Sequence, residues 1–135
     1  MSKDDWENGL RVRTEVMGED FVNRALDGAS DFTRPMQDWL NEHAWGSTWQ
    51  REGLSRQTRS LVTIAMLAAL KAPTELKGHV RGALRNGCSV ADIQEVLLQS
   101  LLYCGAPAAQ EAFRAAREVI EDWEAARAQT GPAAP

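Results

Sequence analysis

Residues 55–87 read SRQTRSLVTIAMLAALKAPTELKGHVRGALRNG, and this stretch decides the fold because it holds two helices and the signals that separate them. Ser55 is a candidate N-cap for the first helix. Pro73 breaks the chain, and Thr74 is a candidate N-cap that restarts it. Gly87 follows the second helix as a C-terminal stop. We therefore predict a helical hairpin, with helices over residues 55–71 and 74–86.

The first helix of this hairpin changes character along its length. It begins basic and polar, with Arg56 and Arg59, and from Leu61 to Leu70 it is apolar on all sides. A helix that is apolar all round is normally buried all round. We therefore expect the second half of this helix to lie inside the protein.

The rest of the chain shows helical periodicity, and no alternating apolar run bounded by hairpin signals indicates a strand. Ser89 and Asp92 form a capping box, with Asp in place of the usual Glu. The pattern predicts an all-α fold of six to seven helices in a single domain over residues 1–127, followed by a flexible tail over 128–135. The further helices are predicted from Trp6 to about Gly18, from Phe21 to Gly28, from Thr33 through His43, from Ser89 to Gly105 and from Pro107 to about Arg127.

Composition excludes several classes of protein. The formal net charge is −4, from 15 Lys and Arg against 19 Asp and Glu, which argues against a nucleic-acid binder with a basic surface. The longest apolar stretch, 61–70, is about half of what a membrane span needs. The first residues show no signal-peptide pattern, and Cys88 and Cys104 form no C-x-x-C pair. We expect a cytoplasmic, reduced protein without a metal site and without nucleic-acid or membrane partners.

Glu75 and His79 are the most informative titratable pair. They are four residues apart, so on a helix they share a face and a carboxylate–imidazole hydrogen bond is within reach. Such a bond orients the imidazole and raises its basicity, as a general acid or base requires. The alternative is a surface pair with no catalytic role, which spacing alone favours. Glu95, inside an apolar helix, either faces solvent or turns inward with a perturbed pKa.

Arginines gather around the hairpin. Because Arg binds carboxylates through two parallel hydrogen bonds, converging arginines suit a small dianionic ligand. The alternative is a solvated helix start with ion pairs to Asp or Glu, which base rates favour. The arginines concerned are Arg51, Arg56, Arg59, Arg81 and Arg85.

Aromatic residues gather just before the hairpin, in the segment from His43 to Trp49. Trp45 and Trp49 are candidates for pocket walls, or for packing anchors in the core or at a subunit contact. Tyr103 and Cys104 end the apolar helix before Gly105. Cys104 is most simply a buried small hydrophobic residue, since no base stands near it in the sequence.

Six segments in a fixed order resemble the carboxymuconolactone decarboxylase family of the AhpD-like superfamily. The resemblance covers about residues 5 to 125, and the combination is specific although each piece alone is weak. The segments are Ala44-Trp45-Gly46 with Trp49, Arg51 and Gly53-Leu54; Thr58-Arg59-Ser60-Leu61 with Thr63-Ile64-Ala65-Met66; Glu75-Leu76-Lys77 with His79 and Arg81; Asn86-Gly87; Glu95-Val96-Leu97-Leu98; and Tyr103-Cys104-Gly105 with Pro107-Ala108-Ala109.

The resemblance implies an all-α fold of helical hairpins that assembles into a homo-oligomer, a trimer or a homohexamer. It also implies an enzyme that decarboxylates 4-carboxymuconolactone to 3-oxoadipate enol-lactone without a cofactor, in the protocatechuate branch of the β-ketoadipate pathway of aromatic hydrocarbon catabolism. The implied partner is a small anionic lactone.

Two departures from the family pattern affect this interpretation. Redox relatives carry C-x-x-C before the histidine, whereas this chain has Ala72 and Glu75 at those places, so thiol redox chemistry is not expected. Related decarboxylases often have His-Cys where this chain has Gln99-Ser100. The alternatives are therefore a same-fold enzyme for another small acidic lactone or keto acid, and a non-catalytic oligomeric helical protein.

Combining the residues with the implied reaction suggests a role for each candidate. Arg51 and Arg59 are expected to bind the substrate carboxylates, while His79, oriented by Glu75, stabilises the dienolate and returns the proton. Glu95 is a second candidate for the proton step. The further candidates for substrate contact are Arg56, Arg81, Trp45, Trp49, Tyr103 and Cys104.

Overall fold

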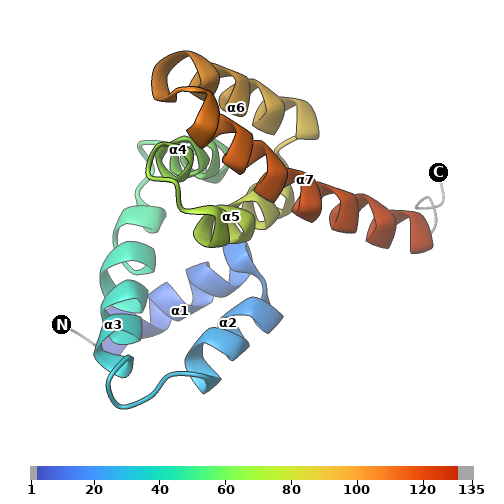
Figure 1. Ribbon diagram of the computed structural model, residues 1–135. Coiled ribbons are helices and arrows are strands. Elements are labelled where there is room, and N and C mark those ends of the chain that lie inside the picture. The colour runs from blue at the N-terminus through green and yellow to red at the C-terminus, as the bar shows by residue number, and fades with distance from the viewer. Residues whose placement is uncertain (1–2, 131–135) are drawn as a thin grey trace. The chain divides into compact units, whose positions relative to one another are not determined.

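The computed structural model describes residues 3–130, and every regular element in that range is helical (Figure 1), so the all-α prediction is confirmed. No helix in the described range is both long and apolar enough to cross a membrane. The elements are α1 (Lys3–Met17), α2 (Glu19–Asp27), α3 (Arg34–Trp39), the π-helix η1 (Leu40–Trp45), the 3-10 helix η2 (Thr48–Gln50), α4 (Arg56–Ala69), α5 (Pro73–Arg85), α6 (Val90–Cys104) and α7 (Ala106–Gln129).

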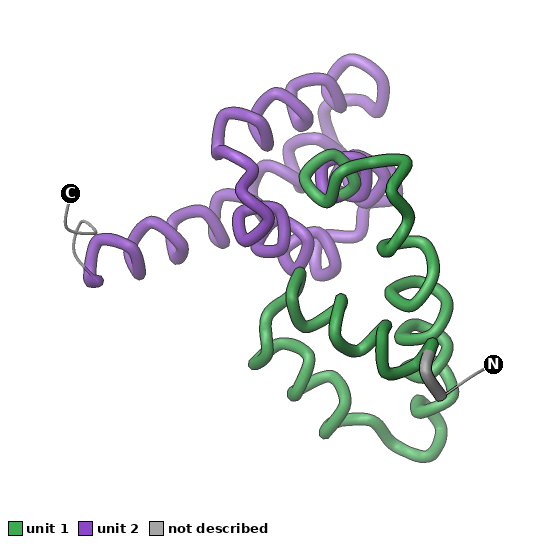
Figure 2. The backbone as a smooth tube through the Cα atoms, turned by 180° about the vertical axis from the view of Figure 1, so that it is seen from behind, with its two compact units in different colours: residues 1–59 green, residues 60–135 purple. Residues whose placement is uncertain are grey.

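The chain packs as two compact units, residues 1–59 and 60–135 (Figure 2), where the sequence predicts one domain over 1–127. Helix α4 begins in the first unit and ends in the second. Helix α7 extends to Gln129, two residues into the tail predicted over 128–135. Residues 131–135 of that predicted tail lie outside the described residues.

In the first unit, α1 packs closely against the π-helix η1. A Cβ added to Gly9 would lie 1.5 Å from the backbone oxygen of Asn41, so only glycine permits this approach. The core beside this contact contains two tryptophans from the end of η1 and from η2. The buried apolar residues of the unit are Val12, Val16, Met17, Val22, Trp45 and Trp49.

The same unit buries a charged side chain. Arg13 is 5% exposed, and its Nη1 donates to Gln37 Oε1 and to Asn41 Oδ1, both at 2.9 Å. Burial lowers the pKa of Arg13. A buried polar group is costly unless it is hydrogen-bonded, and these two bonds tie α1 to α3 and to the π-helix η1.

The second unit is a layered packing of α5, α6 and α7 with the second half of α4 (Figure 1). Helix α7 presents alanines to its neighbours, Ala108, Ala112 and Ala116 among them, which lets helices pack closely. The buried core also includes residues of α4, α5 and α6, among them Ile64, Leu76, Val80, Ile93 and Leu97.

Two of the three predicted helix caps are correct. Ser89 accepts from the backbone N–H of Asp92 while the Asp92 carboxylate accepts from the N–H of Ser89, each at 3.0 Å, so the capping box is confirmed. Ser55 Oγ accepts from the backbone N–H of Thr58 at 3.0 Å. The Thr74 cap is wrong: Ala72 is the N-cap of α5, because Pro73 has no N–H and fits the first helical position.

The expected all-round burial of residues 61–70 is wrong. Ile64 and Ala68 are buried, but Val62, Met66 and Leu70 are 38%, 61% and 73% exposed. These three lie at four-residue spacing, so they form one stripe along α4 that continues to Leu70, just beyond the end of the helix. The helix therefore buries only one side within the chain and leaves an apolar side uncovered.

Candidate active site

The candidate site residues are distributed over both units. Those before the unit boundary are Trp45, Trp49, Arg51, Arg56 and Arg59; those after it are Glu75, His79, Arg81, Glu95, Tyr103 and Cys104.

In the first unit, the two candidate tryptophans stack on each other. The rings of Trp45 and Trp49 are 4.7 Å apart between centroids and inclined by 23°. Both are buried, and Gln50 Nε2 donates to the Trp45 carbonyl at 3.2 Å. The tryptophans therefore act as packing anchors, which was one of the two interpretations left open by the sequence.

Trp49 also contributes to a shallow surface hollow of about 460 Å³. Beside it, the exposed rings of Trp39 and His43 contact each other at 5.2 Å between centroids. Ser47 and Thr48 add hydroxyl groups to the lining. The hollow is thus aromatic with a polar edge, as a pocket wall requires, and Trp39 was not singled out from the sequence.

The three candidate arginines of the first unit differ in their surroundings. Arg56 Nη1 lies 2.7 Å from Glu15 Oε2, and this hydrogen bond lowers the pKa of Glu15. Arg59 is partly buried, and its Nη2 donates to the Arg51 carbonyl at 3.3 Å, while Arg51 is exposed. Arg59 and Arg51 are therefore linked, whereas Arg56 forms the intramolecular ion pair that the alternative interpretation proposed.

In the second unit, His79 is partly buried on α5, with its Nδ1 atom inaccessible. Burial lowers the pKa of His79 to about 4. A carboxylate partner would raise this pKa, so the direction is opposite to the one expected from Glu75. Glu75 itself is exposed in the first turn of α5. His79 is therefore a neutral imidazole at neutral pH.

The other candidates of the second unit lie nearer solvent. Glu95 is exposed on α6, so of the two expected orientations it takes the solvent-facing one. Cys104 is also exposed, and the expectation that it is a buried hydrophobic residue is wrong. Tyr103 is 76% exposed, because the end of α6 presents these side chains outward. Arg81 is partly exposed on α5.

The structure distinguishes the two positions that depart from the family pattern. Gln99 is exposed on α6. Ser100 is buried, and its Oγ donates to the Leu97 carbonyl at 2.6 Å. Ser100 is thus bonded to its own helix, and Gln99 is the one able to meet a ligand. Within residues 3–130, no three His, Cys, Asp or Glu side chains gather in a way that suits a metal ion.

Comparisons with known proteins agree with the resemblance. The model of the carboxymuconolactone decarboxylase family matches residues 34–118. A protein of Acinetobacter baylyi named 4-carboxymuconolactone decarboxylase is 45% identical over 117 residues, 87% of each chain. A protein of Metarhizium robertsii named nitrosuccinic acid decarboxylase is 42% identical over 117 residues, which is 87% of this chain and 82% of the relative. The match runs through both compact units and most of the helices described above, and the chain therefore belongs to the carboxymuconolactone decarboxylase family.

Proposed function

We propose that this chain decarboxylates 4-carboxymuconolactone to 3-oxoadipate enol-lactone, in the cytoplasm, as a step of protocatechuate catabolism. The observation that carries the proposal is the 45% identity to the Acinetobacter baylyi decarboxylase over 87% of both chains. The candidate residues supply what the reaction needs: arginines for two carboxylates and an imidazole for a proton.

The substrate carries its own electron sink, which is why this chemistry proceeds without a cofactor. The departing carboxylate is vinylogous to the ring carbonyl. When its C–C bond breaks, the electron pair moves through the alkene onto the carbonyl oxygen, carbon dioxide leaves, and a dienolate remains. The protein must then hold the dianion, stabilise the charge on that oxygen, and return a proton to carbon.

We assign the dianion to Arg59 and Arg51. Arg59 is partly buried and bonded to the Arg51 backbone, so its guanidinium is held in place before substrate arrives. The charge of Arg56 is already compensated by Glu15. We therefore place Arg56 in a supporting role, together with Arg81, Tyr103 and Cys104 as further substrate contacts. Trp49 is proposed as the pocket wall, with Trp45 stacked behind it.

We assign the proton to His79, with Glu75 orienting it and Glu95 as the second candidate for the step. With a pKa of about 4 in the unliganded protein, the imidazole is neutral. Bound carboxylates raise the pKa of a nearby imidazole, because opposite charge favours the protonated form. His79 is thus proposed to take up a proton together with the substrate and to deliver it to the dienolate carbon.

The test uses the purified lactone and follows carbon dioxide release. We expect His79→Gln to lower kcat by about 10²- to 10⁴-fold. Arg59→Gln should lower kcat/KM by about 10- to 100-fold, while the matched control Arg56→Gln, one turn away on α4, changes it only a few-fold. Wild-type kcat in a folded His79→Gln variant contradicts the assignment of the proton, and absence of turnover by the wild-type protein contradicts the substrate.

A second candidate substrate is nitrosuccinic acid, because the Metarhizium robertsii relative is nearly as similar as the first. Nitrosuccinate is also a dicarboxylate with an internal sink: losing the carboxylate beside the nitro group leaves a nitronate. The exposed Gln99 stands where related lactone decarboxylases often have His. Comparing kcat/KM for the two substrates in one assay decides between them.

We also propose that the chain acts as a homo-oligomer, a trimer or hexamer. The support is a set of large apolar side chains that the second unit leaves exposed, which is typical of a protein–protein contact surface. These residues are Val62 and Met66 on α4, Leu70 just after it, and Leu98, Leu101, Leu102 and Tyr103 on α6.

A further inference from the structure

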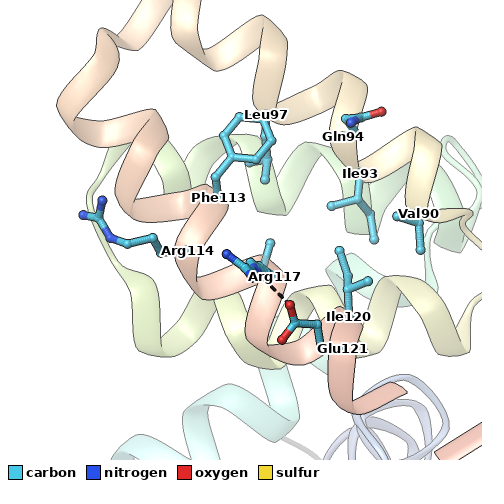
Figure 3. Close-up of a pocket in the computed structure, with 10 residues that line it drawn as sticks. Val90, Ile93, Gln94, Leu97, Phe113, Arg114, Arg117, Ile120 and Glu121 are labelled. Carbon is cyan, nitrogen blue, oxygen red and sulfur yellow. Dashed lines mark hydrogen bonds and ion pairs between the residues drawn. The ribbon is translucent and has the colours of Figure 1, made fainter. Parts of the chain in front are cut away.

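A groove runs between α6 and α7 in the second unit, apart from every residue assigned to the decarboxylation (Figure 3). Its volume is about 460 Å³, within the range of small-molecule pockets. Apolar residues line both sides: Val90, Ile93 and Leu97 from α6, and Phe113, Ala116 and Ile120 from α7.

The groove follows the facing sides of the two helices. Figure 3 shows Leu97 and Phe113 at one end and Val90 and Ile120 at the other. Val90 and Leu97 are seven positions apart, which is about 10 Å along a helix. Ile93 and Leu97 are almost fully buried and form the floor of the groove. Val90, Phe113 and Ile120 are less buried and lie along its sides. A row of apolar residues over this distance matches the length of an unbranched aliphatic chain.

One charged pair faces the groove. Arg117 Nε donates to Glu121 Oε1 at 2.7 Å, and Figure 3 shows this pair beside the apolar side chains. Arg114 also lines the groove, but Figure 3 shows its side chain pointing away from Ile93 and Leu97. The cation that lies beside the apolar side chains is Arg117.

The geometry of this pair leaves room for a second anion. Glu121 accepts a hydrogen bond from Nε alone. Among residues 3–130, no hydrogen bond or ion pair involves the two terminal nitrogens of Arg117. Those nitrogens form the edge that binds a carboxylate through two hydrogen bonds. Since the Arg117–Glu121 contact is an exposed i,i+4 ion pair, it is weak and adjusts easily.

We propose that the α6–α7 groove is a binding site for an unbranched aliphatic monocarboxylate, whose chain lies along Ile93 and Leu97 and whose carboxylate binds the terminal nitrogens of Arg117. This site is independent of the proposed decarboxylation, because none of its residues takes part in that reaction. It suits a ligand of one charge with a long apolar body, unlike the small dianion assigned to Arg59 and Arg51.

Titration calorimetry of the full chain with octanoate, and with 1-octanol as the neutral counterpart, tests the proposal. We expect saturable binding of octanoate, several-fold tighter than octanol. Arg117→Gln should weaken octanoate about tenfold and leave octanol unchanged. Glu121→Gln should tighten octanoate about two- to threefold, because the amide still accepts from Nε while its negative charge is gone.

The matched control is Arg127→Gln, the same substitution farther along α7, which should change neither affinity. Ile120→Glu should abolish octanoate binding with the helix content retained, since it places a carboxylate in the groove. Equal affinity for octanoate and octanol, an unchanged affinity in Arg117→Gln, or no saturable heat each overturns the proposal. A smaller assembly of the Ile120→Glu variant in light scattering also overturns it, by identifying the groove as a subunit contact.

Discussion

At the scale of single residues, burial sets the properties of the ionisable groups more than their neighbours in sequence do. His79 illustrates this: its four-residue spacing from Glu75 suggests a basic imidazole, but burial lowers its pKa to about 4. Arg13 illustrates it again, because a charge on the first helix is buried and satisfied by amides from residues 37 and 41. Spacing predicts which residues share a helix face, whereas the dielectric environment depends on what covers that face.

The pH dependence of stability tests the state of His79. Its pKa is about 4 when folded and near 6.5 when unfolded, so between these values the unfolded chain binds more protons. The contribution of His79 is therefore complete above pH 6.5 and is lost as the pH falls toward 4. We expect the loss of this contribution to lower the free energy of unfolding by about 2 kcal/mol when the pH falls from 8 to 5. Urea denaturation of wild type and His79→Gln measures this, and identical pH profiles would contradict it.

Gly9 allows a second prediction at this scale. Gly9→Ala places a methyl group 1.5 Å from the Asn41 oxygen, and backbone atoms cannot move aside cheaply. We expect a loss of about 3 kcal/mol or more in the stability of the first unit. The control is Asn8→Ala on the exposed side of α1, which should be nearly neutral. Thermal melts of both variants, followed by Trp fluorescence, decide the matter; matching melting temperatures would show that α1 shifts without cost.

At the scale of elements, local sequence signals predicted most helix ends correctly, but they did not predict which side of a helix is buried. The Ser89–Asp92 box is present as predicted because capping is settled by atoms three residues apart. Nothing in the local sequence predicted the π-helix η1, because the periodicity there indicated one helix from Thr33 through His43. Its extra residue is stabilised by packing of α1 against Asn41, a contact between segments 32 residues apart.

The capping box predicts the effect of a single substitution. Ser89→Ala removes the acceptor for the Asp92 N–H and should cost about 1 kcal/mol of stability. Ser47→Ala is a suitable control, because Ser47 precedes η2 without a side-chain capping bond. Chemical denaturation followed by circular dichroism measures both. An equal loss in the two variants would mean that the box contributes nothing beyond its side-chain volume.

At the scale of the whole molecule, the exposed apolar side chains on α4 and α6 are the feature that a lone chain does not explain. Met66 is 61% exposed and Leu102 is 75% exposed. Burying one large apolar side chain typically contributes about 1.5–3 kcal/mol. Covering several of them in a subunit contact would therefore stabilise an oligomer. This surface supports the proposed oligomer.

The oligomer prediction is tested by charge introduced into this surface. We expect Met66→Lys combined with Leu102→Lys to reduce the mass measured by light scattering to that of smaller species, with helix content unchanged. Leu54→Lys provides the control, since Leu54 is an exposed leucine of the first unit outside α4 and α6. Retention of the full mass in the double variant would exclude this surface as the subunit contact.

The amino-acid sequence by itself determined the all-α class, most helix boundaries and the family, because caps, breakers and periodicity act over a few residues. Tertiary structure alone decided that α4 and α6 keep an apolar side exposed, that Cys104 faces outward, that His79 is neutral, and that a groove opens beside Arg117. Burial is a property of what packs over a side chain, and those partners are distant in the sequence.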